Sequence, residues 1–266
     1  MVKHFKRIIA ISVVLFILLM TISGSFAHEN QTDLSEEESV CYLSESVDIY
    51  FDASAADDGD GSRQNPYNTI ESSKLKNNSN IYFEDGDYIL ESEELNLENV
   101  NIFGKNPEKT SVYAHNSNWH VVNVNARGTF AISNITIKNM HFNITDGMTA
   151  TNSNFILDLW YKYDNGGAIS SGADTFSTIN INGCKFYNYT ACFGGAVLCD
   201  NGILNVENCE FYNNYVFPYQ YVLAEGGAIL IHNSTAKIRN SYFKGNTADY
   251  SGGAITNILS NATVFN

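Results

Sequence analysis

Four copies of the tetrapeptide Gly-Gly-Ala followed by an aliphatic residue occur within the last hundred or so residues of this 266-residue chain. Successive copies start 28, 32 and 26 residues apart, a period that is typical of a repeat protein. In a repeat protein each unit stacks on its neighbour, so chain length sets the number of units. The glycines of the four copies are Gly166 and Gly167, Gly194 and Gly195, Gly226 and Gly227, and Gly252 and Gly253.

A second repeated element lies between these tetrapeptides and predicts short strands on both sides of a bend. Over residues 179–186, apolar and polar residues alternate around one turn-forming residue, which is Asn in most copies. Alternation at a period of two turns one face of each strand inward, and no helical period fits it. The copies span residues 179–186, 204–211 and 236–243, with earlier copies at 135–142 and 95–102.

The spacing of the two elements predicts the fold class. Two of the tetrapeptides precede the next turn residue, Asn208 or Asn240, by 14 residues, and Phe186 precedes Phe211 by 25. A unit of this length has short strands and tight turns but no room for a helix. It fits one rung of an all-β, single-stranded parallel β-helix, with rungs about 4.8 Å apart.

Stacking of such rungs predicts what fills the interior and the corners. The inward Phe142, Phe186, Phe211 and Phe243 would form an aromatic stack. The turn Asn residues would form a ladder in which each side-chain amide bonds to the next. The Gly-Gly-Ala tetrapeptides would allow the backbone to turn closely at one corner.

Cys184 and Cys209 fall in the same register on successive predicted rungs. The expected separation of stacked Cα atoms suits a disulfide, and the alternative is a ladder of small buried hydrophobic groups. Met140, Val100 and Ser241 take the same position in the other copies, which favours the ladder. The cysteines (Cys41, Cys184, Cys192, Cys199 and Cys209) include no Cys-x-x-Cys, so no metal site and no cofactor are predicted.

The first 46 residues predict export rather than core structure. Basic residues precede an apolar run over 8–22, and a small-x-small pattern follows over 25–27, so we interpret residues 1–27 as a signal peptide. The apolar run is shorter than the roughly 20 residues that span a bilayer as a helix, and an uncleaved signal anchor is the alternative. The acidic residues 28–46 predict a flexible spacer.

We assign residues 47–115 to an N-terminal cap and the first rungs, and residues 116–266 to the repeats. A short segment over 69–75 would cover the open end of the core. The acidic residues 57–61 resemble part of a Ca²⁺ loop but lack its terminal Glu, which favours a surface turn. Asn266 follows Gly252 by 14 residues, which predicts a chain truncated in mid-rung, with edge-to-edge association at that end.

Charge restricts the partners. The chain carries a net charge of −14; without residues 1–27 the 15 − 3 = 12 basic groups face 29 acidic ones, giving −17. This charge disfavours nucleic acid and anionic lipid, and membrane contact would come only through the signal or an anchor outside this chain. Seven Asn-x-Ser/Thr sites suit an exported glycoprotein: Asn30, Asn77, Asn134, Asn143, Asn188, Asn233 and Asn261.

The repeats resemble those of the adhesin-like proteins of methanogenic archaea, which are of the polymorphic outer-membrane-protein type with GGA[ILV] and FxxN signatures. FxxN is intact over 211–214 and 243–246 and degenerate over 186–189, where the Asn has moved one place. Segments within 50–88 also look like that family. The resemblance covers roughly residues 47–266. It implies a right-handed β-helix displayed at the cell surface with a binding role, and it carries over no catalytic residue.

The arc between each inward Phe and the following tetrapeptide predicts the binding surface because its length varies. It spans 24, 8, 15 and 9 residues in successive units. Insertions on one face of a repeat protein often form its binding face, and Tyr and Trp are common interface anchors. The alternative is that these loops pack on the solenoid and bury their rings. The candidates are Trp160, Tyr161 and Tyr163, with Phe155, in the first insertion, and Phe217, Tyr219 and Tyr221 in the second.

Three functions follow, in order of preference. The first is a secreted or cell-surface adhesin-like protein that binds a glycan or a protein of another cell. The second is a β-helix polysaccharide lyase or glycosidase, since pectin-type lyases share this fold class, and the third is a structural surface-layer spacer. An enzyme needs paired carboxylates, or a cation site with a nearby base. The acids and histidines show no such pairing: Asp158, Asp164, Asp174, Asp200, Glu207, Glu210, His115, His120, His141 and His232.

Overall fold

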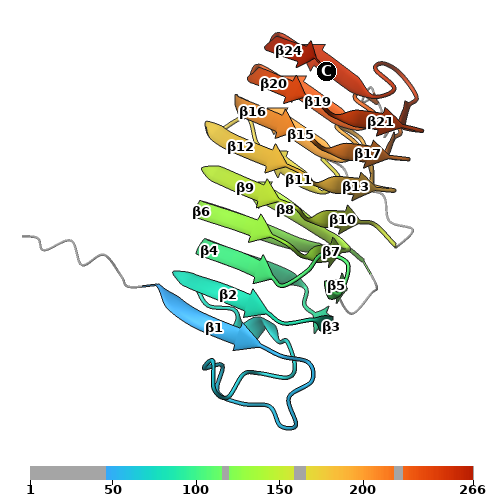
Figure 1. The fold of residues 1–266 in the computed structure, drawn as a ribbon. Coiled ribbons are helices and arrows are strands. Elements are labelled where there is room, and N and C mark those ends of the chain that lie inside the picture. Colours follow the sequence, from blue (N-terminus) through green and yellow to red (C-terminus); the bar gives the residue numbers. More distant parts are fainter. Residues whose placement is uncertain (1–45, 116–119, 159–165, 219–223, 266) are drawn as a thin grey trace, which may run out of the picture. The chain divides into compact units, whose positions relative to one another are not determined.

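The computed structural model describes residues 46–115, 120–158, 166–218 and 224–265. Apart from the single 3-10 turn η1 (Ser72–Lys74), the regular elements in these ranges are all strands, and their pairings are parallel. The strands stack as successive rungs of a right-handed single-stranded parallel β-helix (Figure 1), which confirms the predicted fold class. The predicted signal peptide and spacer lie outside the described residues.

Each rung of the solenoid runs through three faces. The first face contains the beginnings of β4 (Glu94–Gly104) and β6 (Val122–Ser133), then β8 (Met140–Ile144), β11 (Ile169–Ser171), β15 (Val197–Asp200), β19 (Ile229–His232) and β23 (Ile255–Ile258). The second face contains β1 (Val47–Phe51), β2 (Ser79–Phe83), the ends of β4 and β6, β9 (Gly147–Thr151), β12 (Ser177–Asn182), β16 (Gly202–Glu207), β20 (Thr235–Arg239) and β24 (Asn261–Phe265).

The third face forms a separate sheet, and a small sheet fills the corner that follows it. The third face contains β3 (Gly86–Glu91), β5 (Thr110–His115), β7 (Thr136–Lys138), β10 (Asn154–Ile156), β13 (Lys185–Tyr187), β17 (Glu210–Tyr212) and β21 (Tyr242–Lys244). The corner sheet contains β14 (Thr190–Ala191), β18 (Tyr215–Val216) and β22 (Thr247–Ala248). The Gly-Gly-Ala tetrapeptide comes next and leads into the first face.

The predicted aromatic stack exists, but one member differs. Phe155, Phe186, Phe211 and Phe243 stack with ring centroids 4.8, 4.9 and 4.7 Å apart and interplanar angles of 5°, 5° and 3°. Phe142 does not belong to this column. It lies on the first face and meets Phe155 edge-on, at 6.2 Å and 88°.

The two early repeat copies, residues 95–102 and 135–142, do not lie at the same corner of the solenoid as the three later copies. Phe186 pairs with Phe155, so the equivalent of residues 179–186 is 148–155 and not 135–142. Likewise the bend at Asn99 joins the first face to the second, whereas the bend at Asn208 joins the second to the third. Alternation of apolar and polar residues is the same on every face, so the pattern alone cannot tell which corner a bend forms.

Asn residues form the corners. Outside glycine, the described residues with positive φ are all Asn, apart from Leu259. Asn tolerates the left-handed region better than other side chains, which explains this choice. The predicted amide ladder is also present: Asn240 donates to Asn208 at 3.5 Å, and Asn208 donates to Asn182 at 3.1 Å.

The Asn of the FxxN motif clamps adjacent rungs together. Asn214 is fully buried; its Nδ2 donates to Phe186 O at 3.2 Å, and its Oδ1 accepts the Tyr189 N–H at 3.0 Å. Asn246 repeats the contact one rung later, with Nδ2 donating to Phe211 O at 2.9 Å. Where the motif is degenerate, the buried Tyr189 stands in place of the Asn.

The tetrapeptides form the tight corner that was predicted. A Cβ on Gly195 would lie 2.1 Å from Gly227 O, so the close approach of the next rung requires glycine. The first glycine of the tetrapeptide, Gly194, has a φ of +52°. The third residue of the tetrapeptide, Ala, links neighbouring rungs by a backbone hydrogen bond. For example, Ala196 N donates to Ala228 O at 2.8 Å.

The cysteines in the described ranges are all buried, and Cys184, Cys199 and Cys209 are free thiols. Cys184 and Cys209 stack on successive rungs, with Glu210 N donating to Cys184 O at 2.9 Å. Their column continues to Ser153 and Ser241, which confirms the ladder but replaces Met140 and Val100 as its other members. Burial raises the pKa of Cys184 to about 12 and that of Cys209 to about 11, so both stay protonated.

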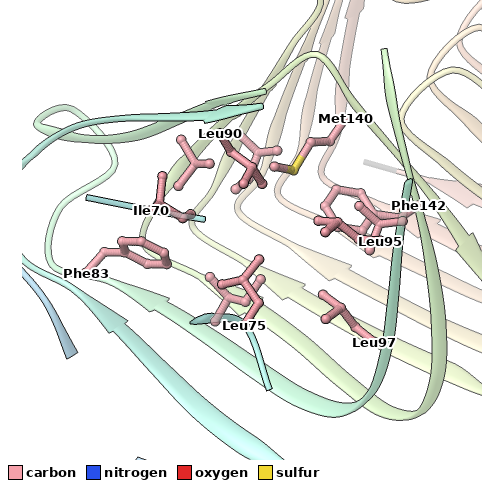
Figure 2. A pocket seen from close by; sticks show the side chains of 12 residues that line it. Ile70, Leu75, Phe83, Leu90, Leu95, Leu97, Met140 and Phe142 are labelled. Carbon is pink, nitrogen blue, oxygen red and sulfur yellow. The ribbon is translucent and has the colours of Figure 1, made fainter. Parts of the chain in front are cut away.

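The segment after Pro66 caps the core, as predicted. Ile70 is buried and Leu75 packs against the core, on either side of η1. Figure 2 shows both side chains closing a small apolar void whose other walls are Phe83, Leu90 and residues of the first face. The void holds only about 20 Å³, so it is a packing gap rather than a ligand site.

The acidic turn serves the same cap. Asp58 Oδ2 lies 2.6 Å from Lys74 Nζ, and its Oδ1 accepts the backbone N–H groups of Asn68 and Thr69. Lys74 also donates to Thr69 and covers the ring of Tyr67 at 4.7 Å. The turn therefore anchors the cap through an ion pair, in agreement with a surface turn rather than a Ca²⁺ loop.

Candidate functional site

The variable arc lies between the third face and the Gly-Gly-Ala corner. Because Phe155 replaces Phe142 in the column, the arc lengths are 11, 8, 15 and 9 residues, measured from Phe155, Phe186, Phe211 and Phe243. The expected first insertion of 24 residues was too long because it contained β9 and β10, which complete a further rung. The two longest arcs remain two rungs apart on the same corner.

The candidate binding residues of this arc fall mostly outside the described part of the chain. Trp160, Tyr161, Tyr163, Tyr219 and Tyr221 lie there. Phe155 is fully buried in the aromatic column, so it is not part of an insertion. Phe217 is only 6 % exposed, so its ring is a packing group in this structure and is not available to a ligand.

A further, smaller insertion lies at another corner, and the sequence prediction did not include it. The tetrapeptide at Gly166 precedes its turn residue, Gly183, by 17 residues instead of 14. The three extra residues enlarge the corner between β11 and β12, where Phe176 is 63 % exposed. Length variation is therefore not confined to one arc, and aligning the turn residues rather than the aromatic ones would have revealed it.

The outer surface of the first face is buried at several rungs. Ser170, Leu198 and Leu230 point away from the core by strand alternation, yet they are 4, 8 and 3 % exposed. This part of the first face is therefore not a free surface. A ligand is not expected to dock there.

A polar cluster that sequence analysis did not identify lies on that buried surface. His141 Nε2 is 2.7 Å from Asn143 Oδ1 and 3.0 Å from Ser170 Oγ. His141 Nδ1 is 3.4 Å from Gly167 O. Burial lowers the pKa of His141 to about 4, so the imidazole is neutral at neutral pH. A Ser–His contact resembles a nucleophile and its base, but His141 is fully buried and gives a substrate no access.

A second histidine is also paired, contrary to the expectation that none would be. His232 Nδ1 lies 2.8 Å from Asp200 Oδ1 on the neighbouring rung. The two side chains are 39 and 21 % exposed. Within the described ranges no group of three or more His, Cys, Asp or Glu side chains could hold a metal ion.

Three acids on or beside the second and third faces are paired with cations. Glu207 lies 3.7 Å from Arg239, Glu210 lies 3.8 Å from Lys185, and Asp158 lies 3.6 Å from Lys138. Glu207 and Glu210 point outward, as alternation predicted. These are surface ion pairs between rungs, which contribute little to the free energy of folding. In each of them the acid faces a cation rather than a second carboxylate.

The glycosylation candidates differ in accessibility. Asn77, Asn188, Asn233 and Asn261 are exposed, whereas Asn134 and Asn143 are half-buried, and Asn30 lies outside the described residues. The Nδ2 atom of Asn143, where a glycan would attach, donates to Asn125 Oδ1 at 3.2 Å. The four exposed sites are therefore the better candidates.

The fold and the two corner motifs define the class of protein. It is a parallel β-helix whose rungs carry Gly-Gly-Ala and FxxN motifs at their corners. Residues 240–257 match the family model of the Chlamydia polymorphic membrane protein repeat. The matched segment includes β21, β22, the Asn246 clamp and the last tetrapeptide. This supports the expected repeat type; an archaeal origin stays a prediction.

A search of the curated proteins found no match to the chain. Among the described residues, no helix is long and apolar enough to cross a membrane.

Proposed function

We propose that this chain is an adhesin-like protein of the cell surface. It would bind a glycan or a surface protein of another cell through the loops of the variable arc. The match to the repeat model supports this, because that repeat is named after a membrane protein. Export through a signal over residues 1–27 is part of the same proposal.

The observation that carries the proposal is where the extra residues enter the solenoid. Each turn residue, at Asn152, Gly183, Asn208 and Asn240, precedes its inward Phe by three residues. The arc after that Phe ranges from 8 to 15 residues. A repeat protein can lengthen such an arc without disturbing the stacked core, which makes it a place for recognition loops.

We further infer that binding is not accompanied by catalysis. The ion pairs of Glu207, Glu210 and Asp158 support this, as does the burial of the Ser170–His141 contact. Incubation of the protein with pectin, polygalacturonate and neutral polysaccharides should release no new reducing ends. Release of products from any of them would favour the lyase or glycosidase.

Binding of the purified protein to intact cells and to an immobilised glycan panel tests the proposal. The test variant carries Trp160, Tyr161, Tyr219 and Tyr221 changed to Ala. The matched control carries Tyr187 and Tyr212 changed to Ala, two rings stacked on the outside of the third face. We expect the test variant to lose binding and the control to retain it. Equal binding by both would refute the role of the arc, and no binding by the unaltered protein would favour the structural spacer.

A further inference from the structure

A cleft lies at the N-terminal end of the second face, remote in sequence from the variable arc. Its volume is about 540 Å³, within the range of small-ligand sites. One wall is the loop over 59–67, and the other is an outer aromatic column of Tyr50, Tyr82 and Phe103. Neither wall belongs to the Gly-Gly-Ala repeats, so the cleft is a feature of the capping region alone.

The loop wall is held in place by backbone hydrogen bonds to the free edge of β1. Tyr50 N donates to Gly61 O at 2.9 Å, and Tyr67 N donates to Tyr50 O at 3.0 Å. Asp52 N donates to Tyr67 O at 2.8 Å. The loop therefore covers the strand edge that would otherwise be unpaired, and the cleft beside it is pre-formed.

The aromatic wall has an open ring face at the end of the column that is farther from the loop. Tyr50 stacks on Tyr82 at 4.8 Å and 14°, and Tyr82 stacks on Phe103 at 5.1 Å and 17°. Within the column the rings cover one another. On the next rung Phe103 pairs with the small Ser133, and no further ring among the described residues stacks on it. A partly exposed aromatic face of this kind suits the apolar C–H face of a sugar ring.

The rim of the cleft carries charged groups with unused hydrogen-bonding capacity. Lys105 Nζ lies 2.5 Å from Glu84 Oε2, and one oxygen of Asp52 accepts hydrogen bonds from Ser54. The guanidinium of Arg63 makes no hydrogen bond or ion pair with the residues that the structure describes. Donors of Arg63 and Lys105 and carboxylate oxygens of Asp52 and Glu84 thus face the same space.

The charges of this cleft cancel, which distinguishes it from the rest of the protein. Two cations and two carboxylates line it, whereas the chain as a whole carries a net charge of −14. An anionic ligand would approach against the overall charge and would meet the two carboxylates. Hydroxyl groups, which both donate and accept, match the mixed rim without a net charge.

We propose that this cleft binds a neutral, hexose-containing oligosaccharide. One sugar ring would pack on the open face of Phe103, and the hydroxyls of successive sugars would bond to Lys105, to Glu84 and, beside the loop, to Arg63. The site is separate from the variable arc and does not depend on the function proposed for that arc. It would give the protein a second point of attachment, at the capped end of the solenoid. Two weak sites on one molecule bind a glycan-covered surface more strongly than either site alone.

Calorimetric titration of the purified full chain with cellotetraose, galactotetraose and mannotetraose tests the proposal. The test variants are Phe103→Leu and Arg63→Gln, which keep the outward side chains similar in size. The matched controls are Arg127→Gln, an exposed arginine elsewhere, and Tyr242→Leu, a 53 % exposed ring on the third face. We expect at least one tetrasaccharide to bind. Each test variant should weaken that binding about tenfold or more, equivalent to about 1.4 kcal/mol, while the controls stay within about twofold.

Three results would overturn the proposal. These are no binding by any neutral tetrasaccharide, equal loss in test and control variants, and tighter binding of tetragalacturonate than of its neutral counterpart. The variant with the four arc aromatics changed to Ala separates this site from the arc. It should bind the tetrasaccharide as the unaltered protein does. If it loses that binding while Phe103→Leu keeps it, the sugar binds at the arc and the cleft proposal fails.

Discussion

Single residues in this solenoid are constrained by neighbours in the next rung rather than by neighbours along the chain. His141 is the clearest case, since its ring meets Asn143 on its own strand and Ser170 and Gly167 on the next rung. Sequence alone showed an isolated histidine. Only the stacking of β8 on β11 brings its partners to it.

Because His141 is buried, we expect the folded protein to lose stability in mild acid. Its folded-state pKa of about 4 lies below the ordinary value of 6.5, because burial penalises the charged ring. Its contribution is therefore fully present above pH 6.5 and is lost as the pH falls through 4, by roughly 3 kcal/mol in total. Urea unfolding at pH 7 and pH 4.5 should show a smaller stability difference for His141→Gln than for the unaltered protein. Equal differences would contradict the prediction.

A side chain introduced at Gly195 should destabilise the protein, because the corner there has no room for it. Its Cβ would lie 2.1 Å from Gly227 O and 3.0 Å from Tyr215 N, both backbone atoms that cannot move aside. Gly195→Ala should lower the free energy of unfolding by about 3 kcal/mol or prevent folding. The control is Gly172→Ala, where nothing lies within 4 Å, and it should change stability by less than about 1 kcal/mol. Chemical denaturation compares them, and similar losses would contradict the close approach.

At the scale of elements, strand pairing is not the only contact that links one rung to the next. The corners carry a second set of bonds, in which Asn214 and Asn246 reach from one rung to the backbone of the rung before it. The corner strands β14, β18 and β22 have two residues each, so they need such additional contacts. This gives the Asn of FxxN a structural role that does not require a ligand.

Asn214→Ala should therefore be costly. It leaves the Tyr189 N–H and the Phe186 carbonyl without their side-chain partner in a buried corner, at about 2–4 kcal/mol in total. Asn205→Ala is the matched control, because Asn205 donates to Asn180 at 2.9 Å on the partly exposed second face. We expect its cost to be below about 1 kcal/mol. A comparison of unfolding midpoints would contradict the clamp if the two variants were equally destabilised.

At the scale of the whole molecule, the two ends of the described solenoid differ. The N-terminal end is closed by Ile70 and Leu75 (Figure 2). At the other end Val264 and Phe265 of β24 are 55 and 49 % exposed, and residues 251–265 contain no charged residue and no proline. Charges and prolines are what usually prevent exposed strand edges from pairing with one another.

A protein that ends at Asn266 should therefore associate through this edge. Analytical ultracentrifugation should show a mass that rises with concentration. Val264→Lys should reduce association because it places a charge on the exposed end. Val47→Lys, at a site that is 56 % exposed at the opposite end, is the control and should leave association unchanged. A monodisperse monomer at all concentrations would contradict the prediction.

The repeat period, the alternation and the Gly-Gly-Ala corners determined much of this protein from sequence alone. These features are local, since a tight turn requires glycine or Asn and a strand with one buried face alternates. The fold class, the stacked Phe186, Phe211 and Phe243, and the cysteine ladder followed from them. So did the cap around Ile70.

Only the tertiary structure decided which face each strand occupies and what lies outside the faces. Alternation is the same on all three faces, so Phe142 and Phe155 could not be told apart until pairing placed Phe155 beside Phe186. The burial of Phe217, the partners of His141 and the cleft beside Phe103 depend on contacts between rungs. Residues that meet there are often 20 to 35 positions apart in the chain, for example Glu84 and Lys105 or Asp200 and His232. No local pattern encodes which of them meet.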